Sequence, residues 1–209
     1  GNGTAAILAA GLRLSGPLII RRGRLAGEIA VPRAHLASGM YCEDASATFA
    51  GVAFNAESAR IGGDVLLDRA RIAGGIRFQN ARIEGRLAAS ELTADHLPDA
   101  FDARGLDVSN GLDLQRARLR GSLALDGARL GKAFRAEALE VDGGETAIGA
   151  DVIEVGGNWE MPRAKLIGQL RCPGAEIAGQ LRLTETRIFG SDIAVRGDGA
   201  DIRGGVFLS

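Results

Sequence analysis

Several features are scarce in this chain of 209 residues, and each scarcity excludes a class of protein. Aromatic residues make up only 4% of the sequence, which is too few to fill the core of an ordinary globular domain. Two cysteines cannot supply the disulfide framework of a small secreted domain. No apolar run approaches the roughly 18 residues of a membrane span, and nothing resembles a signal peptide, which points to the cytoplasm.

Charge of one sign is also lacking, since the formal net charge is −1. A protein that imitates DNA needs a strongly acidic surface, and one that binds nucleic acid needs a basic stripe. The basic residues are almost all arginine, with Lys132 and Lys165 as the only lysines. Metal-ligand spacings such as H-x-x-x-H or C-x-x-C are missing. We therefore expect no nucleic-acid partner, no metal and no cofactor.

What is abundant is glycine, with 31 residues, and a repeat that runs through the whole sequence. The repeat unit has eleven residues of the form A-R-[IL]-x-G-x-[LV]-x-[LV]-x-x, with clear copies starting at Ala59, Ala70, Ala117 and Ala175. Every fourth unit has fourteen residues, and these longer units start at Ala45, Leu92, Leu139 and Thr186. The resulting super-repeat of 47 residues covers 12–58, 59–105, 106–152 and 153–199, with partial copies at 1–11 and 200–209. We treat 1–209 as one solenoid domain and expect it to be an excerpt of a longer protein.

Within each unit the apolar positions alternate with polar ones, which is the period of β-strands and not of helices. Glycine recurs at position five, where a corner would need permissive backbone angles. If two units form one coil, position eleven alternates in charge along the stack: Arg22, Asp44, Arg69, Glu91, Arg116, Ala138, Arg163 and Glu185. This alternation favours two units per coil, because like charges on neighbouring strands repel. The three extra residues of each long unit should then loop out on one side at every second coil.

The half-unit A-[RKE]-[IL]-x-G resembles the A-[DN]-L-x-x signature of pentapeptide-repeat proteins, from Leu12 onward. It differs in alternating sides of five and six residues and in carrying Arg where Asp or Asn is usual. The resemblance implies a four-sided right-handed helix; bactofilin-like polymer-forming β-helices are a second likeness. The predicted fold is all-β, a right-handed parallel β-helix of about 8–9 coils of 22–25 residues with four short strands per coil. Some pentapeptide-repeat proteins are DNA mimics that inhibit gyrase.

Two outward features suggest contact surfaces. At position eight, Ile19, Tyr41 and Leu66 would form an apolar stripe on three successive coils, which often marks a protein partner surface. At position two of alternate units, the outward residues on one side of the coil are basic toward the N-terminus and acidic toward the C-terminus. This polarity would favour head-to-tail self-association. The residues on this side are Arg13, His35, Arg60, Arg82, Asp107, Arg129, Glu154, Glu176 and Asp201.

A third feature lies in a long-unit loop, where a cluster of carboxylates with one imidazole suits a cation or a ligand. Its residues are Asp95, His96, Asp99 and Asp102, and a solvated loop broken by Pro98 is the competing interpretation. Cys42 and Cys172 fall on inward positions about five coils apart, so we expect two buried thiols and no disulfide. No residue is assigned a catalytic role.

The sequence thus predicts a non-enzymatic structural or protein-interaction scaffold that associates with itself or with another protein. The first alternative is a carbohydrate-binding or carbohydrate-cleaving β-helix, with the loop of His96 as its glycan site. The second is a pentapeptide-repeat-type inhibitor of a nucleic-acid enzyme.

Overall fold

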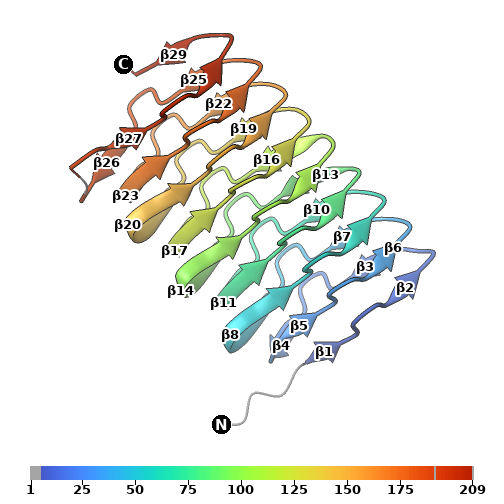
Figure 1. The fold of residues 1–209 in the computed structure, drawn as a ribbon. Helices are drawn as coiled ribbons and strands as arrows, with labels where there is room; N and C mark the ends of the chain where they lie inside the picture. Colours follow the sequence, from blue (N-terminus) through green and yellow to red (C-terminus); the bar gives the residue numbers. More distant parts are fainter. Residues whose placement is uncertain (1–5, 191, 209) are drawn as a thin grey trace.

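The computed structural model describes residues 6–190 and 192–208, and these form a parallel β-solenoid of nine coils without any helix (Figure 1). All strand pairs are parallel, and each strand pairs with the corresponding strand of the next coil. The predicted all-β solenoid is confirmed, and its coils have the arrangement of a pentapeptide-repeat-like β-helix. Part of the first partial repeat, residues 1–5, lies outside the described residues.

The strands form three sheets, which we call A, B and C. Sheet A contains β1 (Ile7–Leu8), β4 (Arg24–Ala26), β5 (Ile29–Ala30), β8 (Ser46–Asn55), β11 (Arg71–Arg77), β14 (Thr93–Asp102), β17 (Arg118–Ala124), β20 (Glu140–Gly149), β23 (Lys165–Arg171), β26 (Arg187–Phe189) and β27 (Val195–Arg196). Sheet B contains β2 (Arg13–Leu14), β6 (His35–Leu36), β9 (Arg60–Ile61), β12 (Arg82–Ile83), β15 (Asp107–Val108), β18 (Arg129–Leu130), β21 (Glu154–Val155), β24 (Glu176–Ile177) and β28 (Asp201–Ile202). Sheet C contains β3 (Leu18–Ile19), β7 (Met40–Tyr41), β10 (Val65–Leu66), β13 (Arg86–Ala88), β16 (Gly111–Asp113), β19 (Phe134–Arg135), β22 (Trp159–Glu160), β25 (Leu181–Arg182) and β29 (Val206–Phe207).

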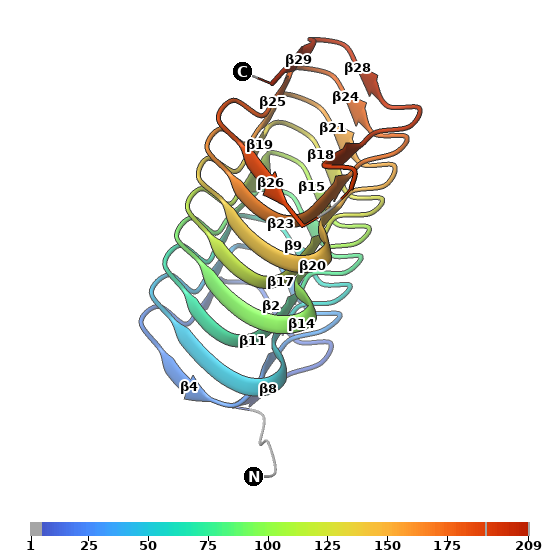
Figure 2. The same cartoon turned by 90° about the vertical axis from the view of Figure 1, so that its left-hand side faces the viewer.

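The number of strands per coil differs from the expected four in most coils. In one N-terminal coil, β4 and β5 are separate strands, and both pair with β8 of the next coil. From β8 to β23 the two sides run together as one strand, so a coil has three strands. The coil still bends between the two sides, and the merged strands are curved (Figure 2).

The extra residues of the long units produce register shifts in sheet A, as predicted for one side at every second coil. The long strands β8, β14 and β20 each have ten residues, whereas β11, β17 and β23 between them have seven. In β14 the pairing with β17 moves from Asp95↔Arg120 directly to Asp99↔Ser122, which leaves residues 96–98 as a bulge. Equivalent shifts occur in β8 and β20.

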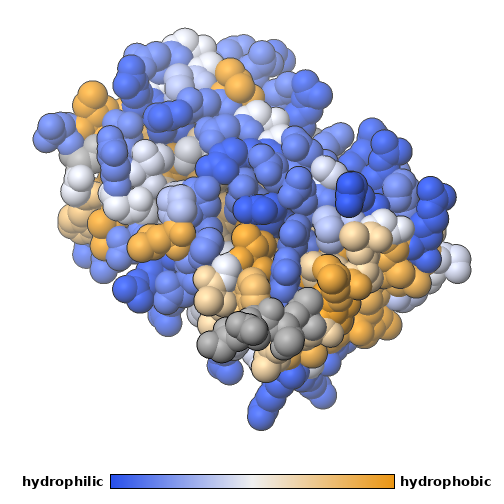
Figure 3. Space-filling model, turned by 60° about the horizontal axis from the view of Figure 1, so that its bottom comes forward, coloured by the Kyte–Doolittle hydropathy of each residue, from blue (hydrophilic) through white to orange (hydrophobic). Residues whose placement is uncertain are grey.

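The core is a continuous file of Ala, Leu, Ile and Val along the solenoid axis. The few aromatic residues stack on one another, as in Phe54, Phe78 and Phe101 with centroid separations of 5.5 and 6.0 Å. Trp159 is fully buried against Phe134 at 5.4 Å, and its strand keeps regular pairing on both sides. Toward the N-terminal end the apolar side chains are only partly covered, and they gather around that end of the molecule (Figure 3).

The prediction that glycine at position five supplies an unusual backbone angle holds on the sheet A side, where Gly27, Gly74, Gly121 and Gly168 have φ values from 111° to 148°, but it does not include a second corner. Position eleven is left-handed in both halves of the coil, mostly without glycine, as in Arg69 with φ 58° and Asn80 with φ 54°. At position five on the turn between sheets B and C, the glycines have ordinary φ values, but the neighbouring coil passes very close. A Cβ atom on Gly85 would lie 2.5 Å from the carbonyl carbon of Gly63. Glycine is required there by the close approach of two backbones.

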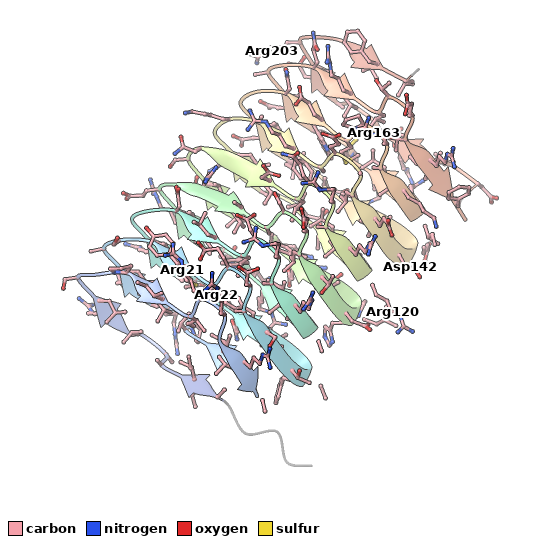
Figure 4. All side chains as sticks on the ribbon, turned by 180° about the vertical axis from the view of Figure 1, so that it is seen from behind. Arg21, Arg22, Arg120, Asp142, Arg163 and Arg203 are labelled. Atoms are coloured by element: carbon pink, nitrogen blue, oxygen red, sulfur yellow. The ribbon has the colours of Figure 1, made fainter. Side chains whose placement is uncertain are left out.

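The position-eleven charges are partly paired as expected. Arg69 donates to Asp44 at 2.8 and 3.0 Å, and Arg116 to Glu91 at 3.0 Å, each pair joining successive coils. Arg163 instead donates to Glu137, which precedes the position-eleven residue Ala138. Figure 4 labels Arg22, the first member of this series, and Arg163, its last arginine. These contacts confirm the stacking of two units per coil.

Candidate functional site

The loop of His96 is the bulge in strand β14 and not a separate excursion from the sheet. It contains a cis peptide bond between Leu97 and Pro98. The imidazole of His96 lies over the neighbouring coil, where a Cβ on Gly75 would be 2.7 Å from its Cδ2 atom. His96 is half-buried, whereas Asp95 beside it is exposed.

Three carboxylates of this region converge on one arginine. The guanidinium of Arg104 lies 2.6 Å from Asp99, 3.0 Å from Asp102 and 3.5 Å from Asp126. The hydroxyl of Ser122 donates a further hydrogen bond to Asp99. Partial burial alone would lower the pKa of Arg104, but the hydrogen bond to Asp99 and the neighbouring carboxylates raise it. The acidic groups are therefore paired with a fixed cation that belongs to the chain.

The predicted set of four residues does not act as one cluster. Asp99 and Asp102 come together on Arg104, while Asp95 pairs with Arg120 at 3.3 Å. In the part of the chain that the structure describes, no group of three or more His, Cys, Asp and Glu residues is arranged to hold a metal ion. The partners Ser122 and Asp126 come from the next coil, and the spacing of the repeat is the sequence signal that indicates them.

A shallow groove runs over the first side of sheet A. Its volume is about 390 Å³, and it is lined by charged side chains of both signs from β17, β20 and β23. Arg118 pairs with Glu140 across neighbouring coils at 3.6 Å. Arg120 and Asp142, which are register partners, project at the same edge (Figure 4). The groove thus has three basic and two acidic side chains, a mixture that does not select strongly for an anionic or a cationic ligand.

The predicted apolar stripe is present on sheet C. Ile19 is the register partner of Tyr41, and Tyr41 is the partner of Leu66, so the three side chains stack on successive coils. Ile19 is 56% exposed, while Tyr41 and Leu66 are half-buried. The guanidinium of Arg21 lies 5.0 Å from the centroid of the Tyr41 ring. We call these three residues the apolar file.

Charge bounds the apolar file on one side. Arg21 donates two hydrogen bonds to Glu43, at 2.9 and 3.1 Å. Burial by itself would raise the pKa of Glu43, but the hydrogen bond from Arg21 lowers it below its ordinary value. Further along the same column the apolar character ends after Ala88, because the next residue is Asp113. The file is therefore a local patch at the N-terminal coils.

The outward-facing residues at position two of the units in sheet B are the fourth candidate feature. Its nine predicted members are register partners from Arg13 to Asp201, so they form one straight file along the solenoid. A hollow of about 1190 Å³ lies over its N-terminal half, and one of about 270 Å³ lies over the C-terminal half. We call this set of residues the sheet B charge column.

Both cysteines are buried and free, as expected from their inward positions. Burial raises the pKa of the Cys42 thiol to about 12 and that of Cys172 to about 11. Thiols with such pKa values are almost entirely protonated at neutral pH and are poor nucleophiles.

No protein family, no curated protein and no solved structure matches this chain. The class of protein is therefore defined by its fold alone, a parallel β-solenoid. None of the described segments forms a helix long and apolar enough to cross a membrane.

Proposed function

We propose that this chain is a non-enzymatic scaffold that binds other proteins through the outer faces of its solenoid. The observation that carries the proposal is the apolar file of Ile19, Tyr41 and Leu66. Exposed apolar side chains in contiguous patches mark interaction surfaces, and this file lies on successive paired strands of sheet C. Tyrosine and arginine, which meet here as Tyr41 and Arg21, are enriched among the residues that contribute most to protein binding.

The absence of enzymatic activity is part of the proposal and is supported by the state of the reactive groups. The carboxylates of half-buried Asp99 and buried Asp102 are held by Arg104, and both thiols are buried with raised pKa values. A carboxylate that acts as a general acid or base must reach the substrate, and here the carboxylate oxygens are engaged by Arg104.

The test places a photo-crosslinking amino acid at position 19 of the full-length chain in its native host. A matched control carries it at Arg135, which occupies the same position of the repeat further along sheet C. We expect a discrete protein adduct from position 19 that is absent from position 135 and lost when Leu66→Asp is added. Adducts that are equal at the two positions, or no adduct at position 19, would contradict the proposal.

The carbohydrate alternative depends on free carboxylates at the bulge of β14, and the pairing with Arg104 and Arg120 leaves little support for it. Retention of the chain on a glycan array, or a calcium-dependent shift of its melting temperature, would favour that alternative. Either response should then be abolished by Asp99→Asn. The inhibitor alternative would be favoured by inhibition of DNA gyrase, for which a mixed-sign surface offers no phosphate-like array.

End-to-end association of copies also stays a prediction. It is checked by light scattering and negative-stain imaging of this chain against concentration. Rods that grow in steps of about 40 Å, the length of nine coils at the strand spacing, would support it. A single compact species at all concentrations would contradict it.

A further inference from the structure

The positive and negative residues of the sheet B charge column follow an order along the solenoid that the repeat itself does not require. From the N-terminus the column contains a basic run of Arg13, His35, Arg60 and Arg82, then Asp107 and Arg129. It ends in an acidic run of Glu154, Glu176 and Asp201. Eight of the nine side chains are exposed, and Asp107 is half-buried.

Both runs place like charges on neighbouring strands, where they repel. Inside the chain the middle of the column is compensated by Arg82 with Asp107 at 3.9 Å and Arg129 with Glu154 at 3.0 Å, and at the C-terminal end Asp201 pairs with Arg203 at 3.5 Å. Within residues 6–190 and 192–208, Arg60 and Glu176 form no ion pair. The other faces differ, because Arg118–Glu140 on sheet A and Arg69–Asp44 at the corner join opposite charges of successive coils.

The column is antisymmetric about the midpoint between Asp107 and Arg129. Residues at equal distance from this point carry opposite charges, or in one case a histidine and a carboxylate. The pairs are Asp107 with Arg129, Arg82 with Glu154, Arg60 with Glu176, and His35 with Asp201. Only Arg13 has no counterpart in this set.

We propose that two copies of this chain pair through sheet B with their solenoid axes antiparallel. A two-fold axis that lies in the interface, parallel to the strands and midway between β15 and β18, places each column against itself in reverse order. Every pair named above is then formed twice, between one copy and its partner. The inference rests on the proposed function as a protein-binding scaffold, and it names the partner of one face.

The flanking residues are compatible with close approach of two such faces. At position four of the same units the residues are Ser15, Ala37, Gly62, Glu84, Ser109, Gly131, Gly156, Ala178 and Arg203. Under the same two-fold, Glu84 meets Gly156 and Arg203 meets Ala37, so no like charges face each other. Packed sheets lie about 10 Å apart, which arginine and glutamate side chains can span together. Arg203 lies near the C-terminal end of the molecule (Figure 4).

The expected dimer is weak and sensitive to salt. Eight strands at about 4.8 Å give a contact about 38 Å long, but it is only one solenoid side wide. Interfaces of such limited area belong to the transient class. Because ion pairs at the edges of an interface are screened, we expect the dissociation constant to rise at least about tenfold between 20 and 300 mM NaCl.

The experiment is sedimentation equilibrium of the chain at 20 mM NaCl, with charge reversals at one predicted pair. Arg60→Glu alone and Glu176→Arg alone should each weaken the dimer at least about tenfold, because two like-charge contacts replace two attractive ones. An equimolar mixture of the two variants should dimerise again, and so should the double variant. Each reversal removes a like-charge contact within the chain, so both variants are expected to fold, as circular dichroism will check.

Arg71→Glu is the matched control, because Arg71 occupies the same position of the repeat on sheet A. It should leave the dimer unchanged. A chain that stays monomeric at millimolar concentration and low salt would overturn the inference. So would a dimer that survives Arg60→Glu, or one that the mixture of the two single variants does not restore. None of these results bears on the crosslinking test of sheet C, so the two proposals can fail separately.

Discussion

Both carboxylate oxygens of Asp44 accept hydrogen bonds from the guanidinium of Arg69, at 2.8 and 3.0 Å, although the two residues are 25 positions apart. Each occupies the left-handed corner of its own coil, with φ values of 57° and 58°. The contact therefore links two backbone corners of successive coils. The hydrogen bond from Arg69 lowers the pKa of Asp44 below its ordinary value, with further contributions from the charges of Arg69, Arg22 and Arg71.

This shift predicts a loss of stability in acid. A carboxylate whose pKa is lower in the folded chain stabilises the fold above its ordinary pKa, near 4, and this stabilisation is lost as the pH falls through the folded value. We expect the melting temperature to fall below about pH 5. Arg69→Gln should reduce the slope of that fall. Arg24→Gln, in which the arginine faces Ser46 of the next coil, should leave the slope unchanged.

The surroundings of Gly121 and Gly127 predict losses of stability of different size on substitution. Gly121 has φ 123°, and a Cβ atom there would lie 2.8 Å from the backbone nitrogen of Ala100. Gly121→Ala should therefore cost at least about 2 kcal/mol of unfolding free energy. Gly127 has φ 66° with open space around it, and Asn80 occupies the same corner position two coils earlier.

Gly127→Asn is accordingly the matched control, with an expected cost below about 1 kcal/mol. Urea unfolding of both variants measures the difference directly. Equal midpoints for the two variants would show that the backbone of β17 moves away from Ala100 to accept a side chain.

Val152 is an unusual occupant of the left-handed corner. It has φ 51°, and its equivalents on neighbouring coils are Gly127 and Gly174. A β-branched residue is disfavoured at positive φ, whereas asparagine tolerates it. Val152→Asn should therefore raise the unfolding free energy by about 1 kcal/mol, and Asn80→Val should lower it by a similar amount. Thermal melts that move in the same direction for both variants would contradict this account.

How well each feature of the fold could be predicted from the sequence depends on the interactions that determine that feature. The coil length and register follow from the side-chain period, because a shift of one residue would turn Ile61 or Ile83 outward. The left-handed corner was not predicted from the sequence, because residues such as Arg69, Asp44 and Glu91 do not by themselves indicate a positive φ. The geometry that closes each coil imposes the positive φ, so the conformational preferences of the individual residues do not predict it.

The candidate site was less predictable than the fold. The apolar file and the sheet B charge column follow from the repeat, and their members are register partners. The bulge of β14 interrupts that register, so the sequence could not show that Asp99 and Asp102 share Arg104 while Asp95 pairs with Arg120. These contacts depend on the path of residues 96–98 and on side-chain conformations.

The buried thiols predict slow chemical labelling. Because burial raises the pKa of Cys42 to about 12 and that of Cys172 to about 11, neither supplies thiolate at pH 8. We expect a disulfide reagent to label neither thiol in the native chain over hours, and both within minutes in denaturant. Cys172 should react first under mild destabilisation, since burial raises its pKa less than that of Cys42. Faster labelling of Cys42 would mean that the N-terminal coils open first.

Substitution of Arg104 tests how far the stability of the β14 bulge depends on its central cation. Arg104→Ala would leave Asp99 and the buried Asp102 without their nearest positive charge. Unpaired carboxylates in a partly buried site are destabilising, and because Arg104 is itself 38% exposed we expect a cost of about 1–3 kcal/mol. Adding Asp99→Asn and Asp102→Asn to Arg104→Ala should recover much of this loss, because the uncompensated charges are removed. The unfolding midpoints of the two variants in urea, at pH 7, provide the comparison. If the triple variant is less stable than Arg104→Ala alone, the carboxylates hold the bulge through their other partners, Ser122 and Arg77, and not through Arg104.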